Sequence, residues 1–293
     1  MKILVTGSNG QLGSELQKLS VKNHYNQYVF TDFDELDITD INAVKAFFTE
    51  YKPDFLINCA AYTAVDKAES DYAKAMLINA DAVANLADSC KICNTAFFHI
   101  STDYVFDGEK ASPYTESDSP NPVSAYGKTK LLGEQNALAY RKTIVIRTSW
   151  LYSTFGNNFV KTMLRLGSEH KKVRVVADQT GSPTYAEDLA AALLKIIEKI
   201  IENPENMKPG IYNFANEGQC SWYDFAKEIM KLGNKNCTVE AISTAEYPTA
   251  AQRPHYSLLS TEKIKNTYYV DVPHWQTSLQ RCINQLTADN RKI

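Results

Sequence analysis

The chain has 293 residues, 44% of them hydrophobic, which is enough to build a nucleotide-binding domain that carries a smaller second lobe. Its 31 Lys and Arg residues stand against 34 Asp and Glu residues, and a net charge of -3 gives no general attraction to nucleic acid or to an acidic membrane. The apolar run at residues 3–5 is too short for a signal peptide, and no later run could cross a bilayer, so we expect a cytoplasmic protein.

The first predicted elements are a strand, a tight turn and a helix. Residues 2–6 form a short apolar run, and apolar residues recur at helical spacing from residue 11 onward. Gly7, Gly10 and Gly13 lie at the turn in a GxxGxxG pattern, where backbone N–H groups and the helix dipole can hold a pyrophosphate. Glycines also serve ordinary strand-to-helix turns, so it is the place of this pattern in the chain that indicates a dinucleotide site.

Asp32 follows the second predicted strand, 19 residues after Gly13. A carboxylate at this place accepts hydrogen bonds from the ribose hydroxyls of NAD. No Arg or Lys lies within four residues of Asp32, so a 2′-phosphate lacks an obvious partner and the sequence favours NADH or a relaxed cofactor preference. The alternative is that Asp32, Asp34 and Asp37 are solvated loop carboxylates.

Strands and helices alternate through the first 150 residues. Short apolar runs predict further strands at 28–30, 55–58, 96–100 and 143–147, and helical spacing predicts helices at 41–51, 73–93 and 124–140. This alternation predicts an α/β fold with a Rossmann-type, doubly wound parallel sheet.

The regular alternation weakens after residue 150. We expect a loop at 178–183, helices at 187–201 and 222–232, and a strand at 211–214. The dinucleotide-binding domain is expected to cover residues 1–170 with a return of 184–217, and a smaller mixed α/β substrate-binding lobe is expected from 171–183 and 218–293.

Ser101, Thr102 and Asp103 directly follow the fourth predicted strand. They are expected at the carboxyl edge of the sheet, where ligands of open α/β sheets bind. The Thr102 hydroxyl can hold a substrate carbonyl there, and the alternative is that it caps a turn or helix.

Tyr126 and Lys130 are four residues apart on a predicted helix, so they share one face. A tyrosine has an ordinary pKa of about 10, and an ammonium about 4 Å away favours its ionised form by at most roughly 4 kcal/mol before screening. A YxxxK pair alone also occurs on exposed helices. Following the glycine turn and Thr102, however, the pair predicts a reductase active site.

Six cysteines are scattered through the chain and are expected to be reduced thiols. Cys90 and Cys93 have the CxxC spacing of zinc or redox sites, but no second CxxC and no spaced His pair completes a metal set. They also end a predicted helix, where the helix dipole would not lower a thiol pKa. We predict no metal site.

With these residues in place, the sequence resembles the extended short-chain dehydrogenase/reductase family and, within it, the dTDP-4-dehydrorhamnose reductases. The motifs that carry the resemblance lie at residues 7–13, 58–69, 101–108, 147–150 and 181–184. The resemblance implies NADPH- or NADH-dependent reduction of the C4 ketone of dTDP-4-dehydro-β-L-rhamnose to dTDP-β-L-rhamnose, the last step of dTDP-rhamnose biosynthesis. Some members of the family depend on Mg²⁺ and form homodimers through carboxylates, for which Glu15 is a weak match.

The same resemblance implies a role for each site residue. Tyr126 donates a proton to the C4 oxygen, Lys130 orients the nicotinamide ribose, and Thr102 holds the reacting oxygen. The residues that the resemblance places around the cofactor are Gly10, Gln11, Leu12, Asp37, Ile38, Ala61, Tyr62 and Thr63.

Three further residues are expected to bind the sugar-nucleotide substrate. Asp103 and Trp150 face the sugar, and Arg253 meets the diphosphate as a bidentate donor. Core packing is the alternative for Trp150, and an exposed salt bridge is the alternative for Arg253. Four other family-like positions are assigned to the fold: Asn216, Glu217, Trp222 and Tyr223.

The residue that follows Asp103 argues against one competing function, dehydration of a sugar nucleotide. Sugar-nucleotide dehydratases carry Asp-Glu after the threonine, whereas Asp103 is followed here by Tyr104, which favours carbonyl reduction. A reductase or epimerase of another NDP-4-keto sugar stays open, as does a non-catalytic regulatory subunit of the methionine adenosyltransferase type. Intact Thr102, Tyr126 and Lys130 argue against that last option.

Overall fold

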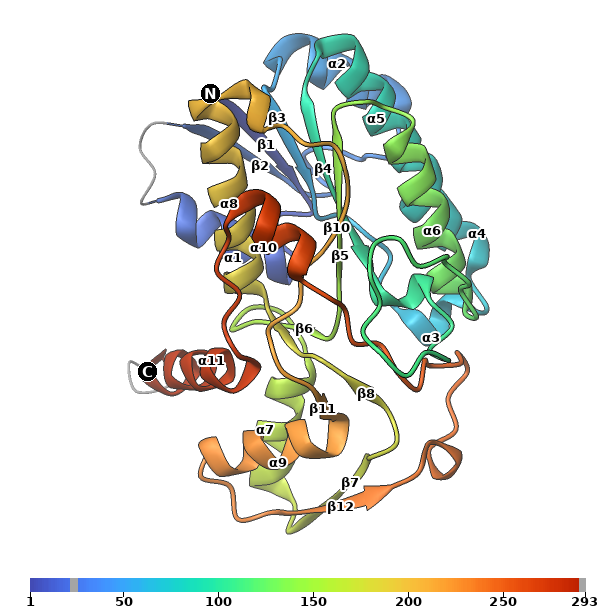
Figure 1. Cartoon of the computed structure of the whole chain (residues 1–293), viewed down its shortest axis with the longest axis vertical. Coiled ribbons are helices and arrows are strands. Elements are labelled where there is room, and N and C mark those ends of the chain that lie inside the picture. Colours follow the sequence, from blue (N-terminus) through green and yellow to red (C-terminus); the bar gives the residue numbers. More distant parts are fainter. Residues whose placement is uncertain (22–25, 290–293) are drawn as a thin grey trace.

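The computed structural model describes residues 1–21 and 26–289. Its centre is a six-stranded sheet in the order β10-β5-β4-β3-β1-β2, and every pair of neighbours is parallel (Figure 1). The strands are β1 (Lys2–Thr6), β2 (Gln27–Thr31), β3 (Phe55–Asn58), β4 (Ala96–Thr102), β5 (Thr143–Thr148) and β10 (Gly210–Asn213). The predicted Rossmann-type parallel sheet is therefore confirmed.

Helices cover both faces of this sheet. On one face, α1 and α8 pack together on a buried cluster that includes Leu12, Leu16 and Ile196. On the other face, α2, α5 and α6 enclose a second cluster around Val44 and Phe48. The bounds of these helices are α1 (Gln11–Ser20), α2 (Ile41–Tyr51), α5 (Ala82–Cys93), α6 (Ala125–Leu138) and α8 (Ala186–Glu202).

Local signals explain where two of the helices begin and end. The Asp40 carboxylate accepts hydrogen bonds from the N–H groups of Asn42 and Ala43 and so caps the start of α2. Asn94 adopts a left-handed conformation (φ 58°) and ends α5 directly after Cys93. The CxxC pair therefore lies at the C-terminal end of a helix, as predicted, and its thiols are free.

The helix predicted for residues 73–93 is in fact three consecutive elements. They are α4 (Tyr72–Met76), a π-helical turn η1 (Leu77–Asp81) and α5. A π turn inserts one extra residue into a helix and is common beside functional sites. This irregularity has no hydrophobic signature, so apolar spacing alone predicted one continuous helix.

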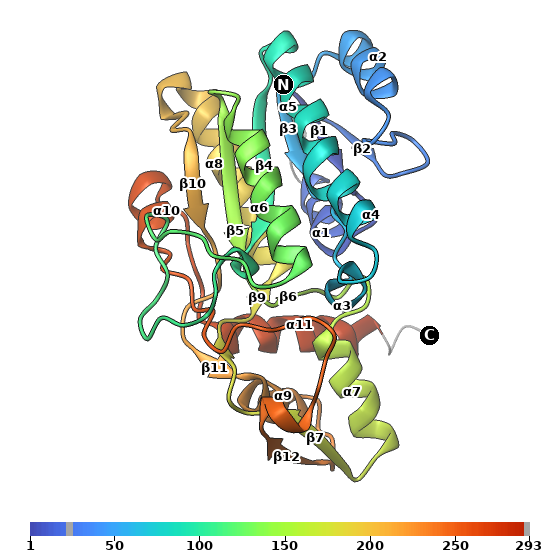
Figure 2. The ribbon, with the colours of Figure 1, turned by 90° about the vertical axis from the view of Figure 1, so that its right-hand side faces the viewer.

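A smaller lobe lies below the carboxyl ends of the sheet strands (Figure 2). Its core gathers buried residues from α7, α9 and α11, together with the parallel pair β7–β12. Its elements are β6 (Leu151–Tyr152), α7 (Phe159–Glu169), β7 (Lys172–Val176), β8 (Thr180–Gly181), β9 (Thr184–Tyr185), β11 (Cys220–Ser221), α9 (Trp222–Leu232), β12 (Thr238–Ile242) and α11 (Trp275–Asp289). Short elements complete the chain: α3 (Val65–Ala68), η2 (Asp103–Val105), η3 (Pro204–Asn206), η4 (Thr244–Glu246) and α10 (Glu262–Tyr268).

Two parts of the lobe differ from the expectation. Residues 159–169, which we expected in the dinucleotide-binding domain, form α7 and bury Val160 and Met163 in the core of the lobe. The expected loop at 178–183 contains the two-residue strand β8, which pairs with β11. Both arrangements depend on partners distant in the sequence, which local spacing does not reveal.

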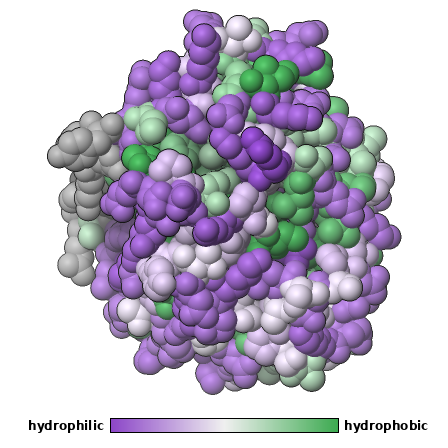
Figure 3. Space-filling model, turned by 45° about the horizontal axis from the view of Figure 1, so that its top comes forward, coloured by the Kyte–Doolittle hydropathy of each residue, from purple (hydrophilic) through white to green (hydrophobic). Residues whose placement is uncertain are grey.

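Two observations describe the hydrophobicity of the helices and of one face of the molecule. In the described part of the chain, no helix is long and apolar enough to span a bilayer. The face shown in Figure 3 is largely hydrophilic, with hydrophobic atoms in a few small groups, as is ordinary for a globular protein.

Candidate active site

One cavity of about 830 Å³ is lined by residues at the carboxyl ends of β1, β3, β4 and β5 and by residues of the smaller lobe. This is the edge at which open α/β sheets bind their ligands. The predicted site residues that line it are Gly7, Gly10, Gln11, Leu12, Gly13, Asp32, Asp37, Ile38, Ala61, Thr63, Thr102, Asp103, Tyr126, Lys130 and Trp150.

The glycine turn forms one end of this cavity. Gly7 has φ 67°, and a Cβ atom there would lie 2.5 Å from the Ala60 nitrogen. A Cβ atom on Gly13 would lie 2.5 Å from the Gly7 oxygen, so β1, α1 and the segment after β3 can approach this closely only because the side chains are absent. Helix α1 has no acidic residue in its first turn, and its N-terminus lines the cavity, which is the arrangement that holds a phosphate anion.

Asp32 lies beside the glycine turn, directly after β2. One carboxylate oxygen accepts the Asn9 N–H (2.8 Å) and the other accepts the Phe33 N–H (2.9 Å). Asp37 is held in a turn, where its Oδ1 accepts the N–H and the hydroxyl of Thr39. Among the described residues that line the cavity, Lys130 is the single lysine and there is no arginine, so the environment of Asp32 offers no cation for a 2′-phosphate.

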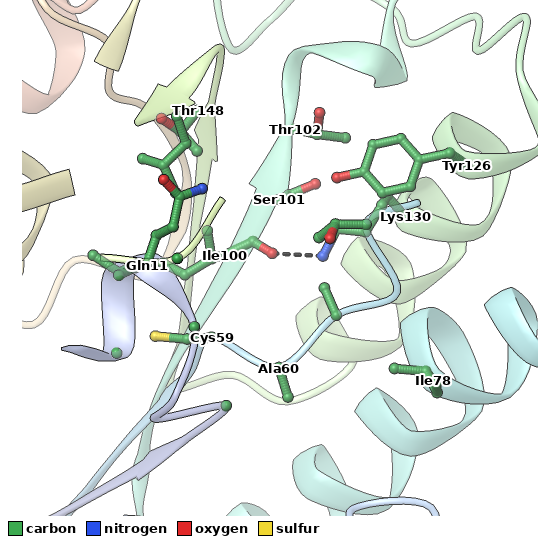
Figure 4. Close-up of a pocket in the computed structure, with 18 of the residues that line it drawn as sticks. Gln11, Cys59, Ala60, Ile78, Ile100, Ser101, Thr102, Tyr126, Lys130 and Thr148 are labelled. Carbon is green, nitrogen blue, oxygen red and sulfur yellow. Dashed lines mark hydrogen bonds between the residues drawn. The ribbon is translucent and has the colours of Figure 1, made fainter. Parts of the chain in front are cut away.

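Helix α6 supplies Tyr126 and Lys130. The Ser124 hydroxyl accepts the Gly127 N–H (3.1 Å) and starts the helix two residues before Tyr126. Figure 4 shows the Tyr126 hydroxyl pointing toward Ser101 and Thr102, and the Lys130 ammonium donating to the Ile100 carbonyl oxygen at 2.6 Å. The helix and the end of β4 thus converge on one region of the cavity.

Thr102 has two roles in this geometry. Its hydroxyl accepts the Tyr104 N–H (3.2 Å) and donates to Asp103 Oδ1 (3.0 Å). It therefore caps the short helix η2, which is the alternative that the sequence left open. The same hydroxyl also lines the cavity beside Tyr126, so the capping role does not remove it from the site.

Burial dominates the proton chemistry of the site. It raises the pKa of Tyr126 to about 12, against the opposing effect of a hydrogen bond with Thr102. The pKa of Lys130 is lowered to about 8 because burial disfavours its charge. The direction for Tyr126 is opposite to the lowering expected from the sequence, since burial of the phenol and the nearby charge of Asp103 outweigh the hydrogen bond with Thr102.

Asp103 is a buried carboxylate that lines the cavity. Burial raises its pKa to about 6, although hydrogen bonds from Ser257 and Thr102 favour the charged form. Its Oδ2 atom is buried and has no hydrogen-bond partner among the described residues. An unpaired acceptor at this position can receive a hydroxyl of a bound molecule.

Trp150 also lines the cavity, in a conformation that is strained for a bulky residue (φ 47°). Its ring stacks on Trp222 with 3.6 Å between the ring centroids and 10° between the planes. Both rings line the cavity, so Trp222 belongs to the site although the sequence assigned it to the fold. Trp222 is the first residue of α9. No local sequence pattern places it beside Trp150, because the two rings meet only through tertiary packing.

Two predicted residues are not in the cavity lining. The Tyr62 backbone is held by Asn79, which accepts its N–H at 2.8 Å and donates to its carbonyl at 3.1 Å, and its hydroxyl donates to Asp71. Arg253 donates to both carboxylate oxygens of Asp66, at 3.0 and 2.7 Å. For Arg253 the structure therefore has the salt bridge that the sequence left as the alternative, and this guanidinium holds the pKa of the Asp66 carboxyl below its usual value.

Other cavity residues were not singled out from the sequence. They lie in or just after the strands β3, β4 and β5, in the π-helical turn η1, or in the loop that leads to α7, and none belongs to a motif with obvious chemistry. They include Cys59, Ile78, Ile100, Thr148, Ser149, Gly156, Asn157 and Asn158.

Comparisons with known proteins agree with this geometry. The family model described as RmlD substrate binding domain matches residues 1–288. The chain is 44% identical over 286 residues to a dTDP-4-dehydrorhamnose reductase from Aggregatibacter actinomycetemcomitans, an alignment that covers 95% of this chain and 97% of the relative. This chain belongs to the dTDP-4-dehydrorhamnose reductase family.

Two solved structures of the family have the same fold as this chain. A dTDP-4-dehydrorhamnose reductase from Clostridium acetobutylicum is 46% identical with a TM-score of 0.92, and the match covers 98% of this chain and 100% of that one. Another from Bacillus anthracis, solved in complex with NADP, is 39% identical with a TM-score of 0.91, covering 97% and 99% of the two chains.

The surroundings of Glu15, the weak match to a Mg²⁺-binding carboxylate of the family, do not fit a divalent cation. Glu15 is fully buried, its Oε1 accepts the Ser153 hydroxyl (2.6 Å) and its Oε2 accepts the Lys18 ammonium (3.2 Å). Lys18 also pairs with Glu187, so a cationic side chain already holds these carboxylates. Among the described residues, no group of three or more His, Cys, Asp or Glu side chains could hold a metal ion.

Proposed function

We propose that this member of the reductase family reduces the C4 ketone of dTDP-4-dehydro-β-L-rhamnose to dTDP-β-L-rhamnose with NADPH or NADH. The observation that carries the proposal is the convergence of the Tyr126 hydroxyl, the Thr102 hydroxyl and the Lys130 ammonium in one cavity, whose other end is the glycine turn. The names of the family relatives supply the substrate.

The dinucleotide is proposed to bind from the glycine turn to Lys130. Its pyrophosphate would meet the N-terminus of α1, where the absent side chains of Gly7 and Gly13 leave room. Asp32 would accept from the adenosine ribose hydroxyls. When bound, the reduced nicotinamide supplies the hydride that attacks C4. The family relative solved with NADP and the carboxylate at Asp32 together support a relaxed preference between NADPH and NADH.

Tyr126 is proposed as the proton donor to the C4 oxygen. A phenol with a pKa of about 12 is protonated at neutral pH, so the proton is in place before the reaction begins. As negative charge develops on the C4 oxygen, the Tyr126 O–H transfers its proton, and the nearby Lys130 ammonium favours the tyrosinate left behind. Thr102 hydrogen-bonds the same oxygen and keeps it within reach of Tyr126.

The substrate is proposed to lie between the end of β4 and the smaller lobe. Trp150 and Trp222 offer an apolar wall for a deoxysugar, and Asp103 has a free buried acceptor for a sugar hydroxyl. Arg253 is proposed to reach the diphosphate only when its pair with Asp66 opens. In this division the sheet, including the returning β10, holds the cofactor, and the lobe, with α7 included, holds the sugar nucleotide.

A direct assay tests the proposal. The purified protein is mixed with dTDP-4-dehydro-β-L-rhamnose and either NADPH or NADH, the loss of nicotinamide absorbance is followed, and the product is identified by NMR. Turnover to dTDP-β-L-rhamnose is expected with at least one cofactor. No loss of nicotinamide absorbance with either cofactor contradicts the proposal. If another NDP-4-keto sugar, assayed in the same way, is turned over faster, that sugar replaces the proposed substrate. The expected homodimer and cytoplasmic location stay predictions.

A further inference from the structure

Glu134 is a buried carboxylate that the reaction proposed above does not use. It lies on α6 eight residues after Tyr126 and four after Lys130, so the three side chains share one face of the helix. Their exposed fractions are 8% for Tyr126, 2% for Lys130 and 1% for Glu134. Burying three ionisable side chains on one helix face costs stability unless each charge has a partner. This cost points to a role for all three side chains in the candidate site.

The Glu134 carboxylate is fully engaged with two neighbouring strands. Its Oε1 accepts the Ser101 hydroxyl at 2.5 Å and the Arg147 Nε–H at 2.9 Å, and its Oε2 accepts Arg147 Nη2 at 2.7 Å. Ser101 in β4 and Arg147 in β5 are direct partners in the parallel register. One carboxylate therefore fixes α6 to both strands at their carboxyl ends.

These contacts reach the proposed catalytic residues through the backbone. Ser101 immediately precedes Thr102, and one turn earlier on α6 the Lys130 ammonium donates to the carbonyl of Ile100. The helix is thus tied to two consecutive residues of β4 by two consecutive turns. A shift of Glu134 along the strands would move Tyr126 and Lys130 relative to the Thr102 hydroxyl.

Glu134 also affects the charge of Lys130. Burial lowers the pKa of Lys130, and the negative charge of Glu134 opposes this lowering. Cys59 after β3 also lies near Lys130, but burial raises the pKa of its thiol well above the usual value, so it adds no charge at neutral pH. His99 of β4 also faces Lys130, and burial together with the lysine charge lowers its pKa well below the usual value, so it adds no positive charge at neutral pH. Asp103 acts on Tyr126 on the other side of the site.

Given the reductase function proposed above, we propose that Glu134 is a positioning residue that docks the Tyr126–Lys130 face of α6 onto β4 and β5 and keeps the Lys130 ammonium charged. Ser101 and Arg147 are its partners in this role. The Arg147 guanidinium also lies over the Phe106 ring, 5.0 Å from its centroid, a cation–π contact that favours this position.

The first test uses Glu134→Gln, which keeps the shape and removes the charge. The kcat is expected to fall at least tenfold, and the alkaline limb of the kcat–pH profile is expected to move to lower pH by about one unit, the size of shift that one neighbouring charge produces. Asp188→Asn is the matched control, since Asp188 is another buried carboxylate paired with an arginine, in α8. The control is expected to keep the wild-type pH profile. An unchanged profile in Glu134→Gln overturns the inference.

A second measurement separates this inference from the proposed function and from misfolding. The protein is labelled with ¹³C at the lysine Cε atoms, and the Lys130 signal is identified by its loss in Lys130→Met. Its titration midpoint is expected to fall by about one unit in Glu134→Gln and also in Glu134→Gln/Arg147→Met, which leaves no unpaired guanidinium. The titration needs no turnover, so it decides the inference even if the ketosugar is not reduced. An unshifted midpoint in both folded variants contradicts it.

Discussion

Replacing Lys130 with methionine is expected to abolish turnover and to make the protein more stable. Lys130 is 2% exposed and its ammonium donates to the Ile100 carbonyl at 2.6 Å. Burial lowers its pKa from 10.5 to about 8, a difference that corresponds to roughly 3 kcal/mol spent on holding the charge in the folded state at neutral pH. Methionine removes this cost with little change in volume.

The gain is reduced by the hydrogen bond that the substitution removes. Leaving the Ile100 carbonyl without its donor costs about 1–2 kcal/mol, so the net stabilisation at pH 7 is expected to be about 1–2 kcal/mol, or a Tm higher by about 3–6 °C. The folded-state pKa lies below the unfolded-state value, so the unfolded chain binds more protons between about pH 8 and 10.5. Wild-type stability therefore rises with pH in that window, and the advantage of methionine shrinks.

Thermal unfolding of the two proteins at pH 7 and pH 9.5, together with the reductase assay, checks these expectations. The variant is expected to lose at least 99% of kcat, by analogy with the removal of other groups that stabilise a transition state. A variant that is less stable than the wild type at pH 7 would show that burying the Lys130 ammonium favours folding, which contradicts the expected gain.

Three other substitutions test different parts of the site. Asp103→Asn is expected to gain about 2–3 kcal/mol of stability at pH 7 and nothing at pH 4. The raised pKa of Asp103 (about 6) makes wild-type stability fall as pH rises from 3.8 to 6. Urea unfolding at both pH values measures the difference, and an equal gain at pH 4 contradicts the expectation. Gly13→Ala places a Cβ atom 2.5 Å from the Gly7 oxygen, and the clash is expected to cost about 1–3 kcal/mol of stability. NADPH affinity, measured by fluorescence titration, is expected to fall at least tenfold. Unchanged affinity would mean that the glycine turn does not hold the dinucleotide. Trp222→Leu removes the stack on Trp150 and is expected to raise the KM for the sugar nucleotide about tenfold. The KM for NADPH is expected to stay constant. A change confined to the KM for NADPH would place the Trp150–Trp222 pair in the cofactor site.

Local sequence patterns predicted the sheet and most of the cavity. The strand-like runs were found close to their observed bounds, and the rule that parallel strands present ligands at their carboxyl ends placed Thr102 near the glycine turn. Tyr126 and Lys130 were predicted on one helix face because their spacing alone decides it. These features depend on residues that are near one another in the chain.

The features that the sequence did not predict depend on distant partners. Strands β7 and β12 pair across more than sixty residues, Trp222 reaches the cavity only through its stack on Trp150, and the side chain of Tyr62 turns toward Asp71. The raised pKa of Tyr126 follows from how completely the phenol is buried, a quantity that spacing cannot supply. The contacts of Glu134 with Ser101 and Arg147 likewise depend on how β4 and β5 pack against α6, which spacing within the helix does not reveal.

The substitution Tyr126→Phe tests whether the tyrosine hydroxyl is the proton donor. The variant keeps the ring and removes the proton that Tyr126 is proposed to give to the C4 oxygen. The kcat for reduction of dTDP-4-dehydro-β-L-rhamnose is expected to fall by about 10²–10⁴-fold, while NADPH affinity measured by fluorescence stays within about threefold of the wild type. A variant that retains more than about a tenth of the wild-type kcat would contradict the assignment of Tyr126 as the proton donor, since loss of a general acid costs roughly 10²–10⁴-fold.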